Sequence, residues 1–407
     1  MNNRTDTQTV EGPTASAAVQ PEAGIEDPTP PGKAAPALLF GMILLALVLV
    51  ISGCATRPGA EVLQTTEGTV PGAQVVTVYA ATTREREAPN SNVFTTGRAR
   101  EPNYSMFTIS VPPNHQPGRI EWPTGRIDPK TSFATLRQSI LTRENFFDQG
   151  AASQNGKRDV TIFVHGYNYS FPEALYRLTQ ISVDAKLDST PMLFAWPSQA
   201  AVAGYVADKD SVTYSRDALA DMMRKLAHDR RVGSINLIAH SMGGWLAMEA
   251  LRQLRLSGEG EVLDRLKVIL AAPDIDVDVF RAQLDVLGPM SSPLIVLVST
   301  DDRALLVSNR ISGARQRVGA LDITDPRVQE AAQKANVALI DISSLKASDG
   351  FNHDRFVNLA ALYPQASGED KKTPGLGIRK AGAFVFNAVG ATISSPFTIV
   401  GGALAGE

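Results

Sequence analysis

Ile235-Asn236-Leu237-Ile238-Ala239-His240-Ser241-Met242-Gly243-Gly244 is a mostly apolar run that ends in a serine followed by small residues. The run 235–239 has the composition of a buried strand, and a helical pattern follows at 245–254. A serine on a sharp turn from a strand into a helix is exposed at the end of a sheet, where it can act as a nucleophile. The turn is strained and tolerates only small neighbours, here Ala239, where the pattern usually has glycine, and Gly243. Ser241 is therefore the predicted nucleophile.

Short apolar runs alternate with helical patterns on both sides of this stretch. Runs that are apolar at nearly every position are typical of strands covered on both faces in a parallel sheet. The alternation predicts the α/β class, with a mostly parallel doubly wound sheet, and two earlier strands predict an N-terminal β extension. The expected strands lie at 75–79, 106–111, 160–164, 192–196, 235–239, 268–272 and 294–298, and the expected helices include 172–183 and 215–227.

A serine hydroxyl is a weak nucleophile unless a general base removes its proton. When a serine sits on such a strand-to-helix turn, the base histidine comes last in the chain. His353 is the only histidine downstream of Ser241, in a loop-like stretch after the apolar run 337–340. We therefore predict His353 as the base, whereas we expect His165 and His240 to be structural.

A carboxylate has to orient the histidine and stabilise its cation, and it is expected between a late strand and the histidine. Asp301 and Asp302 directly follow the strand predicted at 294–298, and we favour Asp302. Asp274 and Asp276, which follow the preceding strand, remain alternatives.

The negative charge of a tetrahedral intermediate requires two preorganised donors, usually backbone amides. The amide of Met242, directly after the nucleophile, is one candidate. The stretch His165-Gly166-Tyr167 follows an earlier strand and points to the amide of Tyr167 as the second. No His, Asp or Glu cluster has metal-ligand spacing, so we expect no bound metal.

The stretch 75–362 resembles a bacterial family of esterase/lipase-like proteins with the alpha/beta-hydrolase fold, formerly catalogued as a domain of unknown function. The resemblance implies a hydrolase that needs no cofactor. It rests on the segments Phe163-Val164-His165-Gly166-Tyr167-Asn168, Phe194-Ala195-Trp196-Pro197-Ser198, Ala239-His240-Ser241-Met242-Gly243-Gly244, Ala272-Pro273-Asp274-Ile275-Asp276 and Asp301-Asp302-Arg303-Ala304-Leu305.

These observations predict a serine carboxylic-ester hydrolase acting on a small-molecule or lipid ester through an acyl-enzyme. A peptidase, amidase or thioesterase with the same triad remains an alternative, as does a non-catalytic envelope lipoprotein that uses the fold for binding. A net charge of -3 gives no basic excess, so we expect no nucleic-acid partner.

The N-terminal region predicts a membrane anchor. Residues 1–53 combine a disordered start with an apolar run at 34–51, and the single cysteine of the chain, Cys54, follows directly after small residues. This pattern resembles a bacterial lipoprotein signal, which implies cleavage before Cys54 and lipidation of its thiol and amine. An uncleaved membrane-spanning helix is the alternative, because the run is just long enough to cross a bilayer.

The remaining organisation follows from these assignments. We expect a tether at 54–74, the hydrolase domain with its β extension at 75–365, and a tail rich in apolar and small residues at 366–407. The tail could pack on the domain, lie on a membrane or insert into it. The predicted location is the bacterial cell envelope, with the domain lipid-anchored to a membrane and facing the periplasm or the exterior.

Overall fold

The computed structural model describes residues 57–68, 70–153, 156–359 and 399–400. The chain divides into two compact units, Met1–Arg57 and Pro58–Glu407, and the fold below is that of the second unit. The predicted signal at 34–51, the lipidation site Cys54 and almost all of the predicted tail lie outside the described residues.

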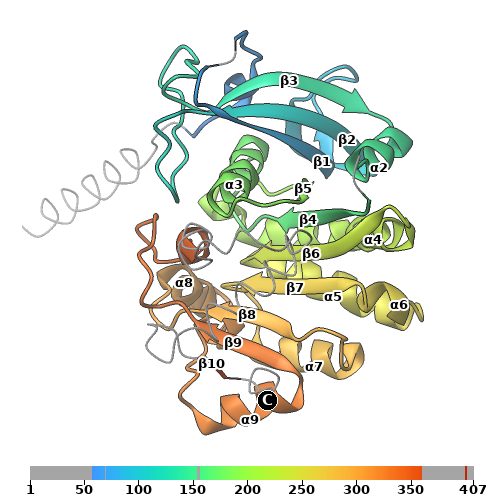
Figure 1. The fold of residues 1–407 in the computed structure, drawn as a ribbon. Helices are drawn as coiled ribbons and strands as arrows, with labels where there is room; N and C mark the ends of the chain where they lie inside the picture. Colours follow the sequence, from blue (N-terminus) through green and yellow to red (C-terminus); the bar gives the residue numbers. More distant parts are fainter. Residues whose placement is uncertain (1–56, 69, 154–155, 360–398, 401–407) are drawn as a thin grey trace, which may run out of the picture. The chain divides into compact units, whose positions relative to one another are not determined.

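Within the described residues, one sheet of ten strands runs through the unit (Figure 1). Strands β4 to β9 are parallel neighbours, and β1 joins them by pairing parallel with β5. Antiparallel pairing occurs only at the two edges, between β1, β2 and β3 and between β9 and β10. In sheet order the strands are β3 (Ala134–Leu141), β2 (Phe94–Val111), β1 (Gln74–Arg86), β5 (Thr190–Ala195), β4 (Arg158–Val164), β6 (Val232–His240), β7 (Leu266–Ala271), β8 (Leu294–Val298), β9 (Val337–Asp341) and β10 (Ile399–Val400).

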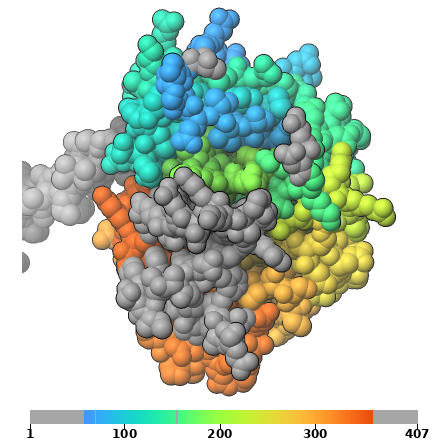
Figure 2. All heavy atoms as spheres, in the orientation of Figure 1, coloured from blue at the N-terminus to red at the C-terminus, as the bar shows by residue number. Residues whose placement is uncertain are grey.

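The predicted mostly parallel sheet and its N-terminal β extension are thereby confirmed. The extension is not a layer of its own, because Tyr79 to Thr82 of β1 pair with Met192 to Ala195 of β5 in the same sheet. Figure 2 shows the side chains of these first strands, blue to teal, meeting the green side chains of the following helix on the face that is drawn.

Helices cover both faces of the sheet, which explains why its central strands are apolar at almost every position. Ile162 and Val164 of β4 belong to the core on one face, and Phe163 between them belongs to the core on the other. The first core includes residues of α4 (Tyr205–His228), α5 (Met242–Leu256) and α7 (Val277–Leu287), whereas the second includes α3 (Phe171–Asp184) (Figure 1). The other helices are α2 (Arg143–Gly150), α6 (Gly260–Leu263), α8 (Arg303–Ile311), α9 (Pro326–Lys334) and the 3-10 turns η1 (Ala60–Leu63), η2 (Val202–Gly204) and η3 (Val318–Ala320).

The helix predicted at 215–227 begins earlier, at Tyr205. The first part of α4 buries polar side chains instead of an apolar stripe. Asp208 accepts hydrogen bonds from the Ser198 hydroxyl and the Gln199 amide, and Ser211 is also buried. Apolar periodicity therefore could not reveal this part of the helix.

A loop after β2 is fixed to α3 by a buried histidine. Nδ1 of His115 lies 2.7 Å from the Glu121 carboxylate, and Nε2 lies 2.9 Å from the Asp184 carboxylate of α3. Burial by itself would lower the pKa of His115, but its hydrogen bonds to Asp184 and Glu121 leave the pKa raised above its usual value.

This raised pKa predicts a pH-dependent contribution to stability. Because the folded-state pKa of His115 exceeds the unfolded value of about 6.5, its contribution is fully present below that pH. The contribution is lost as the pH rises through the folded-state pKa. We expect His115→Gln to lower the free energy of unfolding, measured by urea denaturation, more at about pH 5.5 than at about pH 8.5. Glu121→Gln should reduce this pH dependence, and an equal loss at both pH values for His115→Gln would contradict the assignment.

Candidate active site

Ser241 lies on the turn between β6 and α5 with a strained backbone. Its φ of 54° and ψ of -123° are rare for a residue with a side chain. Such a conformation costs on the order of 1–3 kcal/mol and needs support from its surroundings. The Ser241 amide donates to the Ala271 carbonyl at 2.9 Å, and the Ser241 carbonyl accepts from the Asp274 amide at 3.1 Å. The end of β7 and the loop after it therefore hold the turn in place.

Gly243 allows α5 to approach the end of β4. A Cβ atom at this position would lie 2.3 Å from the carbonyl oxygen of His165 and 2.7 Å from that of Val164. Backbone atoms cannot move aside cheaply, so no larger residue fits. This contact gives a physical reason for the small residue that the sequence has two positions after the serine.

Asp302 and His353 are in direct contact, although they are far apart in the sequence. Nδ1 of His353 donates to Oδ2 of Asp302 at 2.6 Å, and Oδ1 of Asp302 accepts from the Leu305 amide at 3.0 Å. Asp302 is fully buried at the N-cap of α8. Burial by itself would lower the pKa of His353, but the negative charge of Asp302 raises it above its usual value. The pair therefore stabilises an imidazolium ion at this position.

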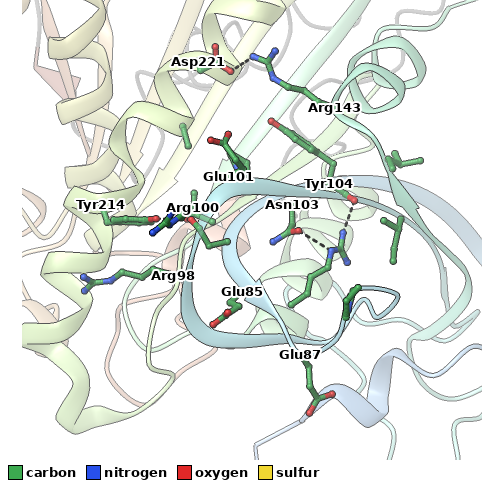
Figure 3. Close-up of a pocket in the computed structure, with 18 of the residues that line it drawn as sticks. Glu85, Glu87, Arg98, Arg100, Glu101, Asn103, Tyr104, Arg143, Tyr214 and Asp221 are labelled. Carbon is green, nitrogen blue, oxygen red and sulfur yellow. Dashed lines mark hydrogen bonds and ion pairs between the residues drawn. The ribbon is translucent and has the colours of Figure 1, made fainter.

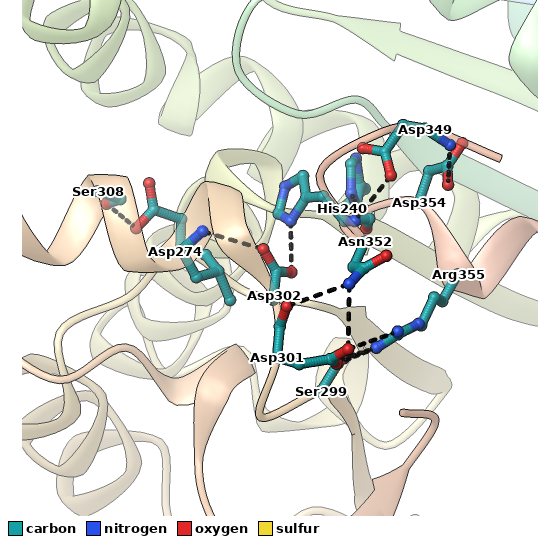
Figure 4. A network of polar contacts seen from close by, with 12 residues as sticks. His240, Asp274, Ser299, Asp301, Asp302, Ser308, Asp349, Asn352, Asp354 and Arg355 are labelled. Atoms are coloured by element: carbon teal, nitrogen blue, oxygen red, sulfur yellow. Dashed lines mark hydrogen bonds and ion pairs between the residues drawn. The ribbon is translucent and has the colours of Figure 1, made fainter. Parts of the chain in front are cut away.

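Asp301 makes contacts of a different kind (Figure 4). It forms an ion pair with Arg355 and accepts hydrogen bonds from Ser299 at 2.8 Å and from Asn352 at 3.0 Å. The hydrogen bond from Arg355 is the main cause that lowers the pKa of Asp301 to about 2. Asp301 thus ties the loop that carries the histidine to the end of β8.

The two fallback acids are also occupied by other partners. Asp274 accepts hydrogen bonds from the Tyr205 hydroxyl at 2.9 Å and the Ser308 hydroxyl at 2.6 Å, and Nε of Arg317 lies 3.3 Å away. Asp276 caps α7 by accepting from the first amides of that helix. Of the four aspartates considered from the sequence, Asp302 is the one that contacts His353.

The loop after β4 lies against the nucleophile. A Cβ atom on Gly166 would be 2.9 Å from Cβ of Ser241, so the chain before Tyr167 passes directly beside the serine. Asn168 has a positive φ of 60°, which turns the backbone here. Tyr167 therefore directly follows a residue that packs against Ser241, and Met242, the first residue of α5, directly follows Ser241 itself.

Two buried charged residues hold this loop, and sequence reasoning did not find either of them. The Asp208 carboxylate accepts from the Asn168 amide at 3.4 Å, and Nη2 of Arg84 donates to the Tyr169 carbonyl at 2.8 Å. Arg84 lies on β1, so a residue of the N-terminal extension supports the loop. Arg84 lies beyond the strand predicted at 75–79, so no signal in the sequence indicated it.

His165 and His240 are placed as structural residues. The ring nitrogens of His165 lie 2.9 Å and 3.2 Å from the carbonyl oxygens of Gly166 and Trp196, and burial lowers its pKa to about 3. His240 stacks on Phe356 at a centroid distance of 4.5 Å, and its Nε2 lies 3.3 Å from the His353 carbonyl. Burial, followed by the charge of His353, lowers the pKa of His240 well below its usual value.

Ser241 and His353, the predicted nucleophile and base, are linked by His240, which directly precedes Ser241 in the chain and lies beside the ring of His353. The rings of His240 and His353 are 4.7 Å apart, whereas the hydroxyl of Ser241 forms no hydrogen bond with a described residue. Hydrogen bonds between nucleophile and base are often long until substrate binds.

The described residues offer no group of three or more His, Cys, Asp or Glu that could hold a metal ion. Within the same part of the chain, no helix is both long and apolar enough to cross a membrane.

A separate cleft of about 1510 Å³ lies between the β1–β2 hairpin and α4 and contains none of the predicted site residues (Figure 3). Its charged residues include internal partners such as Arg143 and Asp221.

Comparison with known families places the described domain among the alpha/beta hydrolases. The family described as alpha/beta hydrolases of unknown function (DUF900) matches residues 144–369, which include Ser241, Asp302 and His353. No curated protein matches the chain.

The Asp302–His353 contact predicts the direction of a measurable pKa change. We expect Asp302→Asn to lower the pKa of His353, because burial then acts without the charge that opposes it most strongly. Titration of the histidine ring signals by NMR measures this change. Asp301→Asn is the matched control and should lower the His353 pKa less. A larger effect of Asp301→Asn would mean that the wrong aspartate is assigned.

Proposed function

The chain belongs to a family of alpha/beta hydrolases of unknown function, and we propose that this protein is a serine hydrolase that cleaves carboxylic esters. The observation that carries the proposal is the contact between buried Asp302 and His353, on the loops that follow β8 and β9. In a parallel sheet these loops lie at the same edge as the turn after β6 that carries Ser241.

The proposed reaction begins with proton transfer from the Ser241 hydroxyl to Nε2 of His353 while the serine oxygen attacks the ester carbonyl. Asp302 holds the imidazole by its Nδ1 hydrogen and stabilises the cation that forms. The tetrahedral intermediate collapses to an acyl-enzyme, and His353 returns the proton to the departing alcohol. Water then repeats the sequence, which releases the carboxylic acid and restores the serine.

The amides of Met242 and Tyr167 are proposed to bind the oxyanion. Met242 is the first residue of α5, and the first amides of a helix lack partners within the helix and carry partial positive charge. Gly166 brings the second loop close enough to Ser241 for the Tyr167 amide to contribute. Loss of one such donor typically reduces the rate on the order of a hundredfold or more.

The alternative functions make different use of Ser241, Asp302 and His353. An amidase or thioesterase would use the same three residues to cleave another bond, whereas a binding protein would not use them for catalysis. Esters are favoured because their alcohol leaving group needs less help than an amine from the single base, His353. The described residues contain no feature that favours the amidase, thioesterase or binding alternatives.

The location is part of the proposal and rests on the sequence pattern at Cys54. Lipidation of Cys54 would anchor the domain to a membrane of the bacterial envelope, facing the periplasm or the exterior. Incorporation of an alkyne-labelled fatty acid into the wild-type chain, and its absence from Cys54→Ser, is the expected result. If the wild type took up no labelled fatty acid and Cys54→Ser still stayed in the membrane fraction, the uncleaved helix would be favoured instead.

A substrate panel tests the reaction. The full chain should hydrolyse p-nitrophenyl esters faster than the matched thioesters and anilides, and Ser241→Ala should reduce the ester rate to background. Ser257→Ala is the matched control, because Ser257 is an exposed serine at the other end of α5. Preferential anilide cleavage would exclude the esterase assignment, and undiminished activity of Ser241→Ala would exclude the nucleophile.

A further inference from the structure

Exposed apolar side chains are concentrated around the candidate active site. Eleven large hydrophobic residues are exposed in the described part of the chain. Six of them lie on three segments: one contacts the proposed oxyanion loop, one is the helix that Asp302 caps, and one is the loop that carries His353. These six, which we call the apolar rim, are Val202, Val206, Leu306, Val307, Ile311 and Phe351.

Val202 and Val206 are 80% and 70% exposed, more than any of the other nine. They lie on η2 and on the first turn of α4. The Tyr167 hydroxyl donates to the Val202 carbonyl, and the ring of Tyr167 packs edge-on against that of Tyr205 at 5.4 Å. This part of the rim is therefore fixed to the loop that is proposed to bind the oxyanion.

Three further rim residues lie on α8, the helix that Asp302 caps. Leu305 and Ser308 face inward, whereas Leu306, Val307 and Ile311 are exposed. The hydroxyls of Tyr205 and Ser308 are 2.8 Å apart, so the start of α4 and the middle of α8 are in contact.

Phe351 completes the rim on the loop that carries the base. It is 57% exposed, two residues before His353, and its carbonyl accepts a hydrogen bond from the Arg303 amide at 2.9 Å. Contacts therefore connect all three parts of the rim to one another. Leaving such residues exposed on several connected segments is unfavourable in water and is typical of an interaction surface.

The charges on α8 indicate what covers the rim. Arg303 and Arg310 are exposed on the same helix as three rim residues and form no ion pair with another described residue. Apolar side chains next to arginine suit a surface that is apolar inside and anionic at its edge. At the start of α4, the half-buried Lys209 and the exposed Asp210 carry opposite charges, so the excess positive charge of this surface lies on α8.

From this arrangement we propose that the apolar rim docks on an anionic lipid surface and that the substrate is a lipid ester drawn from it. The inference rests on the proposed function and names its substrate class. Water and the ester yield a fatty acid and an alcohol, and the acyl chain enters from the lipid between the rim segments. A second copy of the chain is a poorer occupant, because it would cover the segments through which substrate must reach Ser241.

The test compares the hydrolysis of two esters that have the same leaving group. All variants are made in the full chain, so that any N-terminal anchor is common to all of them. One ester is short and soluble, and the other has a long acyl chain and is embedded in phosphatidylcholine vesicles with or without phosphatidylglycerol. We expect Val202→Ser with Val206→Ser, and separately Leu306→Ser with Val307→Ser, to reduce hydrolysis of the embedded ester by about tenfold more than that of the soluble ester. Arg303→Gln with Arg310→Gln should remove the advantage of phosphatidylglycerol.

Leu256→Ser and Val75→Ser are the matched controls, since both residues are exposed hydrophobics, one near the end of α5 opposite to Ser241 and the other at the start of β1. They should leave both activities unchanged. Equal effects of the rim and control variants on the embedded ester would overturn docking on a lipid surface. The proposed esterase function would still stand in that case if the wild type hydrolysed the soluble ester. Absence of soluble-ester activity in the wild type would instead overturn the proposed function. A dimer in solution that the rim substitutions dissociate would also contradict the lipid surface.

Discussion

The close approach of α5 to the end of β4 is the constraint on which the site depends. Without a side chain at Gly243, the helix can begin against the carbonyls of Val164 and His165, and Ser241 must then adopt its strained backbone to turn the chain. The same approach places the first amide of α5 beside the loop after β4. One packing contact therefore positions the proposed nucleophile and both proposed oxyanion donors together.

Charged residues hold each loop that surrounds this turn. Arg84 and Asp208 support the loop after β4, Arg355 and Asp301 tie the histidine loop to the end of β8, and Asp302 orients His353. The ionic contacts thus make the positions of the loops specific, whereas the apolar strands supply the general stability of the sheet.

The sequence predicted the central strands well, because strands such as β8 are short apolar runs covered on both faces. It did not predict β3 and α2, whose polar and half-exposed residues give no clear period. The choice among the aspartates also stayed open, since Asp301 and Asp302 are adjacent and equally well placed in the chain. Tertiary contacts separate them, because Asp302 binds His353 whereas Asp301 pairs with Arg355, and each contact joins residues from different loops.

The most direct test of the account is the mass of the protein after reaction with a fluorophosphonate, a probe that phosphonylates activated serines. The account predicts one adduct per chain, mapped by peptide mass spectrometry to Ser241, and none in Ser241→Ala. An adduct on another serine, or well-folded protein that remains unmodified, would contradict the claim that the turn after β6 carries an activated nucleophile.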